Sequence, residues 1–530
     1  MKTLYLKILF LPALLCACTG NSDLPWNRQG PDDEPLFSHD AIVLGEQLPD
    51  PYSVDNMTKA FESLYPTKAG RAHIEATDFY VRFLPKDESQ MSTLLELGIQ
   101  MLDHPLDYRI LKEGDWYHDP EVPEGEITWQ YAVVPVDFEF PAGIRYERLE
   151  DCYLSEHDPA TKADGIDWDE VERKSYILTG NESMLTPAVR SDSGPVCPEG
   201  YIQIMDPDYS ADPVGVKGVR VCCNSFVKIA MSYTDENGYY RMGRSYSSNL
   251  RYRLVFKNMK GFSQGISNLL LPASVSALGS HPAAGCSVVL DSYSDYHQFI
   301  RCVVNNAGFD YYQICDKSAA TIPAPPKDLR IWDLPVLNGS FNIMMHHGVL
   351  LETFEPLHAV LGEFTIVARL AQPDVYLGLE GCSSYNEAYE RGLKIFTQAG
   401  HFSRVGRDWW HEYLLSFLGS SVFQTFAELL GGVFGGSGGS QAKISHLYTN
   451  YCTTVLYRRH YGNSDAICGA DDKYSPQLLV FLDERGLGLE MLAPLFNAEV
   501  KDMDTLKQKM LSYYPQFKTV ILEAFTRYDN

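Results

Sequence analysis

No stretch of the 530-residue sequence is both long enough and apolar enough to cross a membrane as a helix. A membrane-spanning helix needs about 20 apolar residues, and the apolar run at residues 8–15 is far shorter. Lys2 and Lys7 precede this run, and a positively charged start before a short apolar core is typical of a secretory signal peptide. We therefore expect the rest of the chain to fold into water-exposed domains outside the cytoplasm.

The end of this N-terminal segment resembles the lipobox of bacterial lipoproteins. Residues 15–18 read Leu-Cys-Ala-Cys, and in that family small residues precede a cysteine that is acylated and becomes the first residue of the mature chain. The resemblance implies a signal peptide over residues 1–17 and a lipid on Cys18, which would anchor the protein to the bacterial outer membrane at the cell surface. The alternative is an ordinary signal peptide with two incidental cysteines.

The acidic, proline-containing run that follows predicts a tether over residues 18–45, because it cannot bury apolar surface. Beyond it, the chain length suggests roughly three domains, and 45% apolar content is ample for their cores. The formal net charge of -25 argues against a nucleic-acid partner, since phosphate backbones require clusters of Lys and Arg.

The cysteines do not define a disulfide framework. Of the 12 in the chain, Cys16 leaves with the signal peptide and Cys18 carries the lipid, so ten remain in the mature protein. An even number outside the cytosol permits disulfides, but spacing does not identify the pairs. No two of them form a CxxC motif, which argues against a zinc ribbon or a thioredoxin-type site.

Residues 46–190 predict an N-terminal α+β domain. The expected elements are helices over 55–65 and 92–102 and strands over 79–84 and 129–134. Thr93 and Glu96 have the spacing of a capping box for the second helix. We interpret the acidic and aromatic stretch at 115–119 as a packed loop rather than a binding edge. Turn-forming residues at 185–195 then predict a domain break.

Residues 196–270 predict a small β-sandwich. The stretch 216–221 reads Val-Lys-Gly-Val-Arg-Val, and residues 234–239 read Thr-Asp-Glu-Asn-Gly-Tyr. The Asn237–Gly238 pair favours positive φ at a tight hairpin. These two runs resemble the transthyretin-like module that often stands beside peptidase domains. In that family the module is a spacer or a stabilising companion.

Residues 275–530 predict a helix-rich C-terminal domain. Helical periodicity extends over 420–430, 487–496 and 504–514, and Asp504 is the expected N-cap of the last helix. The glycine-rich run at 431–440 lacks the Lys-Ser/Thr ending of a phosphate-binding loop, so we expect a flexible surface loop.

Ordinary catalytic motifs are absent from this domain. Zinc hydrolases of the HExxH type need two histidines one helical turn apart with a glutamate between them. The only His-Glu pair is His411–Glu412, and Leu415 stands where the second histidine should be. In the preceding segment, Asp206, Asp208 and Asp212 do not follow the EF-hand pattern, so a calcium loop there is not favoured.

One stretch nevertheless resembles a zinc-binding helix. Residues 391–406 match part of the helix "I-H-E-L-A-H-A-S-H-F-x-x-V-G" of surface lipoproteins related to gluzincin metallopeptidases. In that alignment Lys394 replaces the first zinc-binding histidine, Ile395 replaces the catalytic glutamate, and Gln398 replaces the second histidine. The run at 445–462 resembles the family's later helix, where His446 takes the place of the third ligand, a glutamate. Residues 329–332 and 345–348 also resemble family sequence.

The resemblance implies a peptidase-like fold without peptidase chemistry. Lys394 would place an ammonium where a metal cation belongs, and Ile395 cannot transfer a proton. Without a metal to lower the pKa of bound water toward about 7, hydrolysis has no nucleophile by this route. His401 and His446 would line a cleft or simply be polar residues in a partly filled groove.

We therefore expect an α+β multi-domain surface lipoprotein with no catalytic residues, no zinc and no other cofactor. Its expected role is to bind or scaffold a protein, peptide or glycan. Two alternatives stay open: an active hydrolase that uses another site in the C-terminal cleft, and a structural or adhesion component that acts through its N-terminal parts.

Overall fold

The computed structural model describes residues 41–529 with several gaps. The gaps are residues 68–73, 115, 124–125, 164, 187–195, 266–274, 294–295, 319–320, 335–339, 350–371, 380, 383, 419–438, 463–465 and 470–473. The expected signal peptide, Cys18, most of the tether, the 420–430 helix and most of the glycine-rich run lie outside the described residues. In the part of the chain that is described, no helix is long and apolar enough to cross a membrane.

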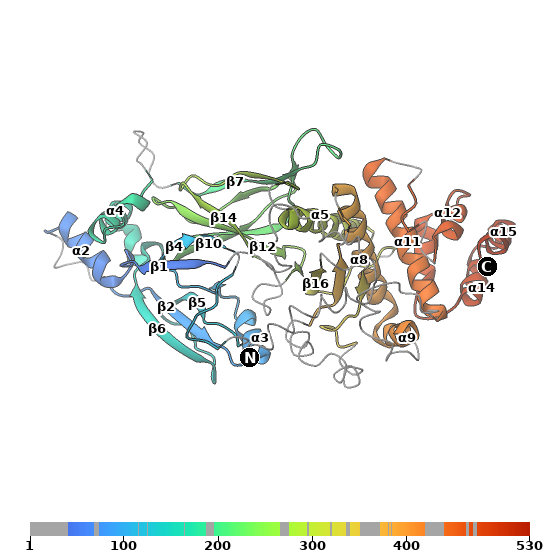
Figure 1. The fold of residues 1–530 in the computed structure, drawn as a ribbon, viewed down its shortest axis with the longest axis horizontal. Helices are drawn as coiled ribbons and strands as arrows, with labels where there is room; N and C mark the ends of the chain where they lie inside the picture. The colour runs from blue at the N-terminus through green and yellow to red at the C-terminus, as the bar shows by residue number, and fades with distance from the viewer. Residues whose placement is uncertain are drawn as a thin grey trace, which may run out of the picture.

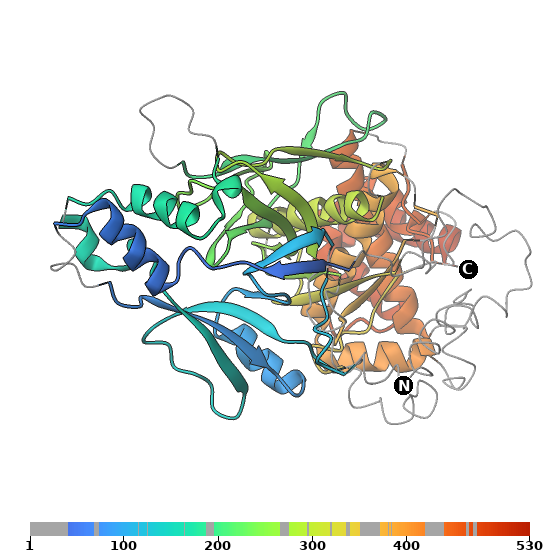
Figure 2. The same ribbon diagram turned by 60° about the vertical axis from the view of Figure 1, so that its left-hand side comes forward.

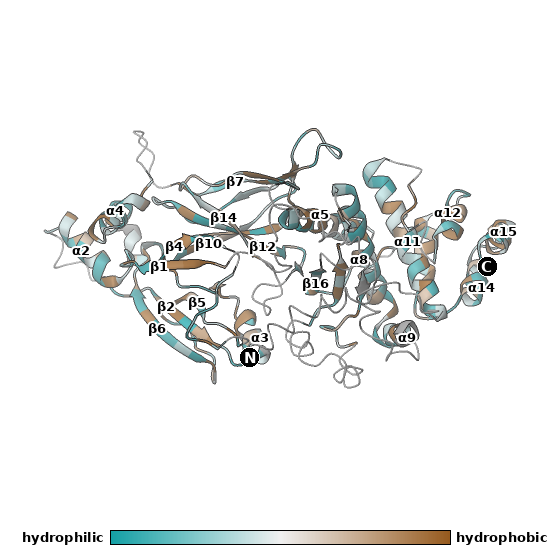
Figure 3. Cartoon of the chain, viewed as in Figure 1, coloured by the Kyte–Doolittle hydropathy of each residue, from teal (hydrophilic) through white to brown (hydrophobic). Residues whose placement is uncertain are grey.

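The described chain is a mixed α/β structure of elongated shape. Figure 1 shows an N-terminal α+β part at one end, β-sheets in the middle and the C-terminal helices at the other end. In Figure 3, apolar residues gather along the central strands, whereas the outer helices show both polar and apolar residues. The mixed α/β, multi-part architecture expected from the sequence is therefore present at this coarse level.

The N-terminal part is α+β, as predicted. Its elements are β1 (Val43–Gln47), α2 (Val54–Leu64), β2 (Asp78–Leu84), α3 (Glu88–Glu96), β3 (Met101–Leu102), β4 (Tyr108–Lys112), β5 (Gln130–Pro135), β6 (Arg145–Cys152) and α4 (Trp168–Leu178). Four strands form an antiparallel sheet in the order β3-β5-β2-β6, and β1 pairs with β4 in a separate ribbon. Helices α2 and α4 pack side by side at the outer end of this part (Figure 2).

The predicted capping box in this part is wrong. Helix α3 begins at Glu88, and its N-cap is Asp87, whose carboxylate accepts a hydrogen bond from Gln90 N at 3.0 Å. Thr93 lies inside the helix and donates its hydroxyl to Ser89 O. Gly98, with a φ of +69°, follows the helix, so the chain is free to enter β3 where the helix was expected to continue.

Two sheets face each other in the middle of the molecule and form a sandwich over residues 199–291. Its strands are β7 (Glu199–Met205), β8 (Val214–Gly215), β9 (Val219–Ser225), β10 (Lys228–Tyr233), β11 (Tyr239–Arg241), β12 (Leu250–Asn258), β14 (Val275–His281) and β15 (Val288–Asp291). One sheet contains β10, β9, β12 and β14, and the other contains β11, β7, β15 and β8. The rings of Tyr240 on β11 and Tyr252 on β12 meet between the sheets, 6.4 Å apart.

The turn at Asn237–Gly238 forms, but its flanking strands are not the predicted hairpin. Gly238 has a φ of +78°, and its N–H donates to Asp235 O at 3.1 Å. Strand β10 pairs with β9, whereas β11 pairs with β7, so the turn carries the chain from one sheet to the other. A Cβ on Gly238 would lie 2.1 Å from the carbonyl oxygen of Ile202, which explains why the position requires glycine.

The sandwich extends past the boundary expected at residues 270–275. Strand β14 pairs with β12, and β15 pairs with β7. The larger sheet also continues beyond β12 through β13 (Phe262–Gln264), β16 (Leu329–Leu334), β18 (Val375–Gly378) and β17 (Phe341–Asn342). A single apolar core reaches from Ile202 to Phe525. The sandwich and the helix-rich part are therefore continuous in both sheet and core.

The C-terminal part is rich in helices, as predicted. They are α5 (Tyr296–Lys317), α8 (Tyr385–Val405), α9 (Arg407–Leu418), α11 (Ser440–Tyr461), α12 (Gln477–Asp483), α13 (Leu489–Leu492), α14 (Met503–Tyr513) and α15 (Lys518–Tyr528). The expected 487–496 helix is only the short α13 followed by a 3-10 turn. The N-cap of α14 is Asp502 rather than Asp504, because the Asp502 carboxylate accepts the hydrogen bond from Thr505 N at 2.7 Å.

Helices α5 and α8 approach each other closely because glycine lies at their contact. A Cβ on Gly308 of α5 would lie 2.4 Å from the Phe396 ring of α8. We expect Gly308→Ala to lower the free energy of unfolding by about 1–3 kcal/mol, since the ring has to move within a packed core. Urea denaturation measures this change. Gly243→Ala is the control, because its Cβ would meet nothing within 4 Å; equal urea midpoints for the two variants would contradict the close contact.

The ten cysteines of the described residues are free thiols, and nine of them are buried. Burial raises the pKa of Cys222, Cys286 and Cys382 to about 11 each. Because the thiolate is the reactive form, these side chains behave as small core residues.

Candidate functional site

The residues predicted from the zinc-helix resemblance lie where α8, α9 and α11 meet. Helices α8 and α11 run antiparallel: His401 near the end of α8 lies beside Ser445 near the start of α11, with Nδ1 and Oγ 3.4 Å apart. At the other end of the pair, Tyr389 of α8 lies beside His460 of α11, with Oη and Nδ1 3.1 Å apart. Lys394, Gln398 and His401 are three or four residues apart on α8, so they share one side of that helix.

The positions that replace the zinc-binding pentad are largely packed. Ile395 is 1% exposed, and its backbone oxygen accepts a hydrogen bond from the Asn342 side chain at 3.1 Å. Gln398 is 4% exposed, and its Nε2 donates to the Tyr413 hydroxyl at 3.4 Å. Lys394 is half-buried, one helical turn before Gln398. These side chains are therefore already engaged in the packing of α8 against its neighbours.

His401 is fully buried in an aromatic surrounding. Its ring lies 4.8 Å from the Tyr448 ring and 5.2 Å from the Trp409 ring. Burial, with a smaller contribution from Arg404, lowers the pKa of His401 to about 3, so the side chain is neutral at physiological pH. Its Nε2 is buried and has no hydrogen-bond partner in the part of the chain that the structure describes. His401 thus acts as a neutral core residue.

His446 is half-buried on α11 and reaches the same cluster through Tyr413. The Tyr413 ring lies 6.3 Å from the His446 ring, and its hydroxyl accepts the bond from Gln398. The structure therefore brings Gln398 and His446 to the same tyrosine, although they are 48 positions apart in the sequence. On the other side, the His446 ring lies 5.7 Å from the Tyr474 ring.

This set of residues does not fit a zinc ion. Zinc takes thiolate, imidazole or carboxylate ligands, whereas the aligned positions offer an ammonium, an aliphatic side chain and an amide at Lys394, Ile395 and Gln398. The fourth aligned position, His446, offers an imidazole. Over the described ranges of the chain, no three His, Cys, Asp or Glu side chains form a group that could hold a metal ion.

The contact between α8 and α11 is unusually polar for a buried surface. Helix α11 is buried over most of its length, including Ser445, Thr449, Thr453 and Thr454. The antiparallel alignment sets Thr397 opposite Thr449, one turn from the His401–Ser445 contact. The buried hydroxyls of Thr397, Thr449 and Thr453 have no partner among the described residues. Each such group costs roughly 1–3 kcal/mol, so the contact is not optimised for stability.

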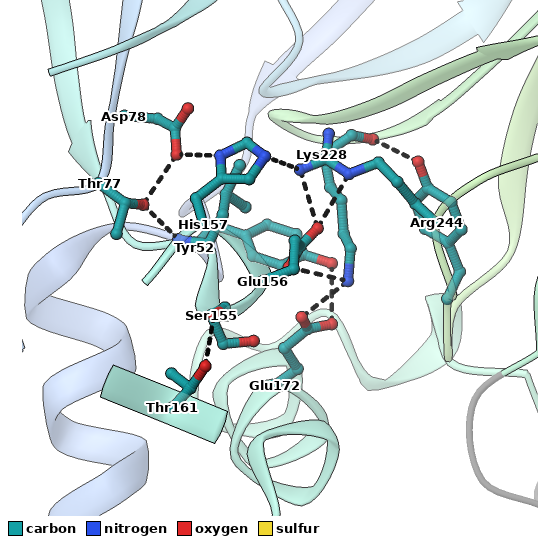
Figure 4. Close-up of polar contacts among 12 residues, drawn as sticks. Tyr52, Thr77, Asp78, Ser155, Glu156, His157, Thr161, Glu172, Lys228 and Arg244 are labelled. Atoms are coloured by element: carbon teal, nitrogen blue, oxygen red, sulfur yellow. Dashed lines mark hydrogen bonds and ion pairs between the residues drawn. The ribbon is translucent and has the colours of Figure 1, made fainter. Parts of the chain in front are cut away.

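A second polar cluster, which the sequence does not reveal, joins the N-terminal part to the sandwich (Figure 4). Lys228 of β10 pairs with Glu172 of α4 at 2.8 Å, and both side chains are less than 5% exposed. The Tyr52 hydroxyl donates to the same Glu172 carboxylate at 3.3 Å. Burial raises the pKa of Glu172, and the neighbouring Lys228 opposes that shift. This buried ion pair joins two parts of the molecule.

The rest of the cluster continues toward the surface. Arg244, in the loop after β11, pairs with Glu156 at 2.8 Å and donates to His157 Nε2 at 3.2 Å. Because Nε2 accepts this bond, the proton of neutral His157 is on Nδ1, which lies 2.8 Å from the Asp78 carboxylate. In Figure 4, positive and negative side chains alternate along this cluster. Their contacts connect β2, α4 and the sandwich in one network.

Other residues considered from the sequence have structural roles. His411 and Glu412 lie on the aromatic-rich helix α9, as expected, and Glu412 pairs with Lys501 at 2.5 Å. His347 lies beside the buried Asp374, with Nδ1 and Oδ1 3.0 Å apart. These contacts satisfy Glu412 and His347 within the protein.

Fold and site together define a mixed α/β protein with a packed polar contact in its helix-rich part. No family model matches the sequence, and comparisons with curated proteins and with solved structures also found no match.

Proposed function

We propose that this chain is a lipid-anchored protein of the bacterial outer-membrane surface that works by binding or scaffolding. In this proposal its helix-rich part is related to the gluzincin-like lipoproteins and has lost their zinc chemistry, and its sandwich is the transthyretin-like companion module. The observation that carries the proposal is the packing of α8. Ile395 and Gln398 are buried and hydrogen-bonded within the protein at the positions where the family needs its base and a ligand.

Zinc in such an enzyme would supply an activated water molecule and polarise the scissile carbonyl. Here Ile395 cannot accept a proton, and the Gln398 amide is turned to Tyr413. The continuous core and the buried Lys228–Glu172 pair support a scaffold role, because they make the sandwich a fixed support for the parts on either side of it.

Metal analysis tests the proposal. The soluble form, residues 19–530, is purified without added metal and then titrated with zinc. We expect less than about a tenth of an equivalent of bound zinc and no rise in melting temperature, since zinc bound at a folded site stabilises the fold. His446→Ala is the matched control. Stoichiometric zinc in the wild type that this variant loses would show that His446 belongs to a working metal site, and would overturn the proposal.

The lipid anchor is tested by paired cysteine variants. We expect the wild-type protein to fractionate with membranes and to incorporate labelled fatty acid, whereas Cys18→Ala should do neither. Cys16→Ala is the control, because it changes the neighbouring cysteine and leaves the acylated position intact. Fatty-acid labelling of Cys18→Ala would contradict the assignment of the lipid to Cys18.

A further inference from the structure

A flat aromatic plate lies where the loop after β7 meets the C-terminal end of α11. Its two members, Tyr209 and His460, have ring planes only 1° apart and ring centroids 5.9 Å apart. They are joined by a hydrogen bond of 2.9 Å between the Tyr209 hydroxyl and His460 Nε2. Both residues are half-buried, so part of the plate is open to solvent.

Two buried tyrosines of α8 support the inner face of the plate. Tyr385 stacks on Tyr209 with centroids 3.9 Å apart, and Tyr389 stacks on His460 with centroids 4.1 Å apart. Tyr461 stands nearly perpendicular at the side, 5.4 Å from Tyr209. These stacking contacts cover one face of each ring, so a ligand can reach the plate only from the opposite face or the outer edge.

A directed chain of hydrogen bonds holds the plate in place. The Tyr389 hydroxyl donates to Asp310 Oδ2 at 3.0 Å, and Lys217 pairs with the same carboxylate at 2.7 Å. Since a tyrosine has one hydroxyl proton, its oxygen must accept from His460 Nδ1, which leaves Nε2 to accept from Tyr209. Burial lowers the pKa of His460, in agreement with the neutral ring that this pattern requires.

The acidic loop at 206–212, considered above as a calcium site, instead positions Tyr209. The Asp206 carboxylate accepts a hydrogen bond from Tyr385 N at 2.8 Å, and its backbone oxygen accepts from Tyr209 N at 3.0 Å. Asp208, next to the plate in sequence, is exposed. The loop therefore fixes Tyr209 against α8 and has an exposed carboxylate one residue before the plate.

We propose that this plate, defined by Tyr209 and His460, is a stacking site for a neutral saccharide. The proposal rests on the binding role proposed above and names its ligand class. The face of an aromatic ring is electron-rich and attracts the weakly positive C–H groups on the flat side of a sugar ring. A hydroxyl of that sugar can donate to the Tyr209 phenol oxygen, whose own proton is donated to His460 Nε2. A net charge of -25 repels phosphorylated or otherwise anionic ligands, and a neutral sugar is unaffected by it.

Calorimetric titration of the soluble chain tests the site with adenosine and with five sugar probes: cellohexaose, maltohexaose, xylohexaose, mannohexaose and chitohexaose. We expect binding of at least one probe, and a roughly tenfold or larger loss of affinity in Tyr209→Ala, because the variant removes half of the stacking surface. Tyr209→Phe keeps the ring and should bind more tightly than Tyr209→Ala. Tyr293→Ala is the matched control, since Tyr293 is 96% exposed and makes no ring contact with the plate.

Three outcomes would overturn the assignment: no binding of any probe by the folded wild type, equal affinity in Tyr209→Ala, or binding of adenosine in place of every sugar. Circular dichroism and melting temperature establish that each variant is folded. The result is independent of the zinc titration, since Tyr209 is not part of the α8–α9–α11 cluster. If the chain bound zinc, the proposed function would be wrong, but the sugar result would still stand. If the chain bound no sugar, the stacking site would be wrong, but the zinc result would still stand.

Discussion

Replacement of Lys228 by methionine is expected to lower the free energy of unfolding by about 3–5 kcal/mol. The substitution leaves the Glu172 carboxylate buried without its partner at the junction of α4 and β10, where both side chains are less than 5% exposed. The Coulombic attraction that compensated for desolvation is then lost, while the desolvation remains. Urea denaturation followed by circular dichroism measures the change.

Two controls separate the buried pair from ordinary surface charge. The double variant Lys228→Met, Glu172→Gln removes both charges and should recover a large part of the loss, because no charge is left buried without a partner. Lys260→Met removes a lysine whose partner, Asp316, has a side chain that is 65% exposed, and should cost at most about 1 kcal/mol. If Lys228→Met and Lys260→Met were equally mild, the buried pair would not hold the junction together.

The stability that His401 contributes is expected to depend on pH. Its folded pKa, lowered to about 3, is below the value of about 6.5 for an unfolded histidine. Its contribution is therefore fully present above pH 6.5 and is lost as the pH falls toward 3, because the unfolded chain binds the proton first. Between pH 7 and pH 5 we expect wild type to lose about 2 kcal/mol relative to His401→Asn, a variant that cannot titrate.

His347 is the matched control for this experiment, because its contribution to stability depends on pH in the opposite direction. Burial is the largest single influence on the pKa of His347 and lowers it, but the hydrogen bond and the charge of Asp374, together with the hydrogen bond to Lys327 O, outweigh burial, and the net shift is upward. The contribution of His347 is thus present at low pH and lost as the pH rises through its folded pKa. Urea titrations at pH 5, 6, 7 and 8 should show His401→Asn and His347→Asn diverging from wild type in opposite directions. Parallel curves for His401→Asn and wild type would show that the His401 ring is hydrated.

The sequence predicted several elements because their signals are local. The apolar spacing of Met57 and Phe61 predicted a helix over 55–65, which is α2, and the pattern at 79–84 predicted β2. Each signal depends only on residues that are close together in the sequence. The Asn237–Gly238 turn formed for the same reason. Helix caps were predicted less well. Asp87 and Asp502 are the N-caps of α3 and α14 because the helices begin directly after them. Nearby polar residues are equally suitable N-caps by sequence, so the sequence alone does not choose between them.

The candidate sites also depend partly on local sequence and partly on tertiary packing. The sequence alone determined which chemical groups stand on α8, including Lys394 and Ile395. Only the tertiary structure decided what those groups contact, because burial of His401 and the approach of Gln398 to Tyr413 depend on how α9 and α11 pack. The plate of Tyr209 and His460 and the pair of Lys228 and Glu172 each join segments distant in sequence. Such pairs form because packing and desolvation act between neighbours in space, and local propensity carries no information about them.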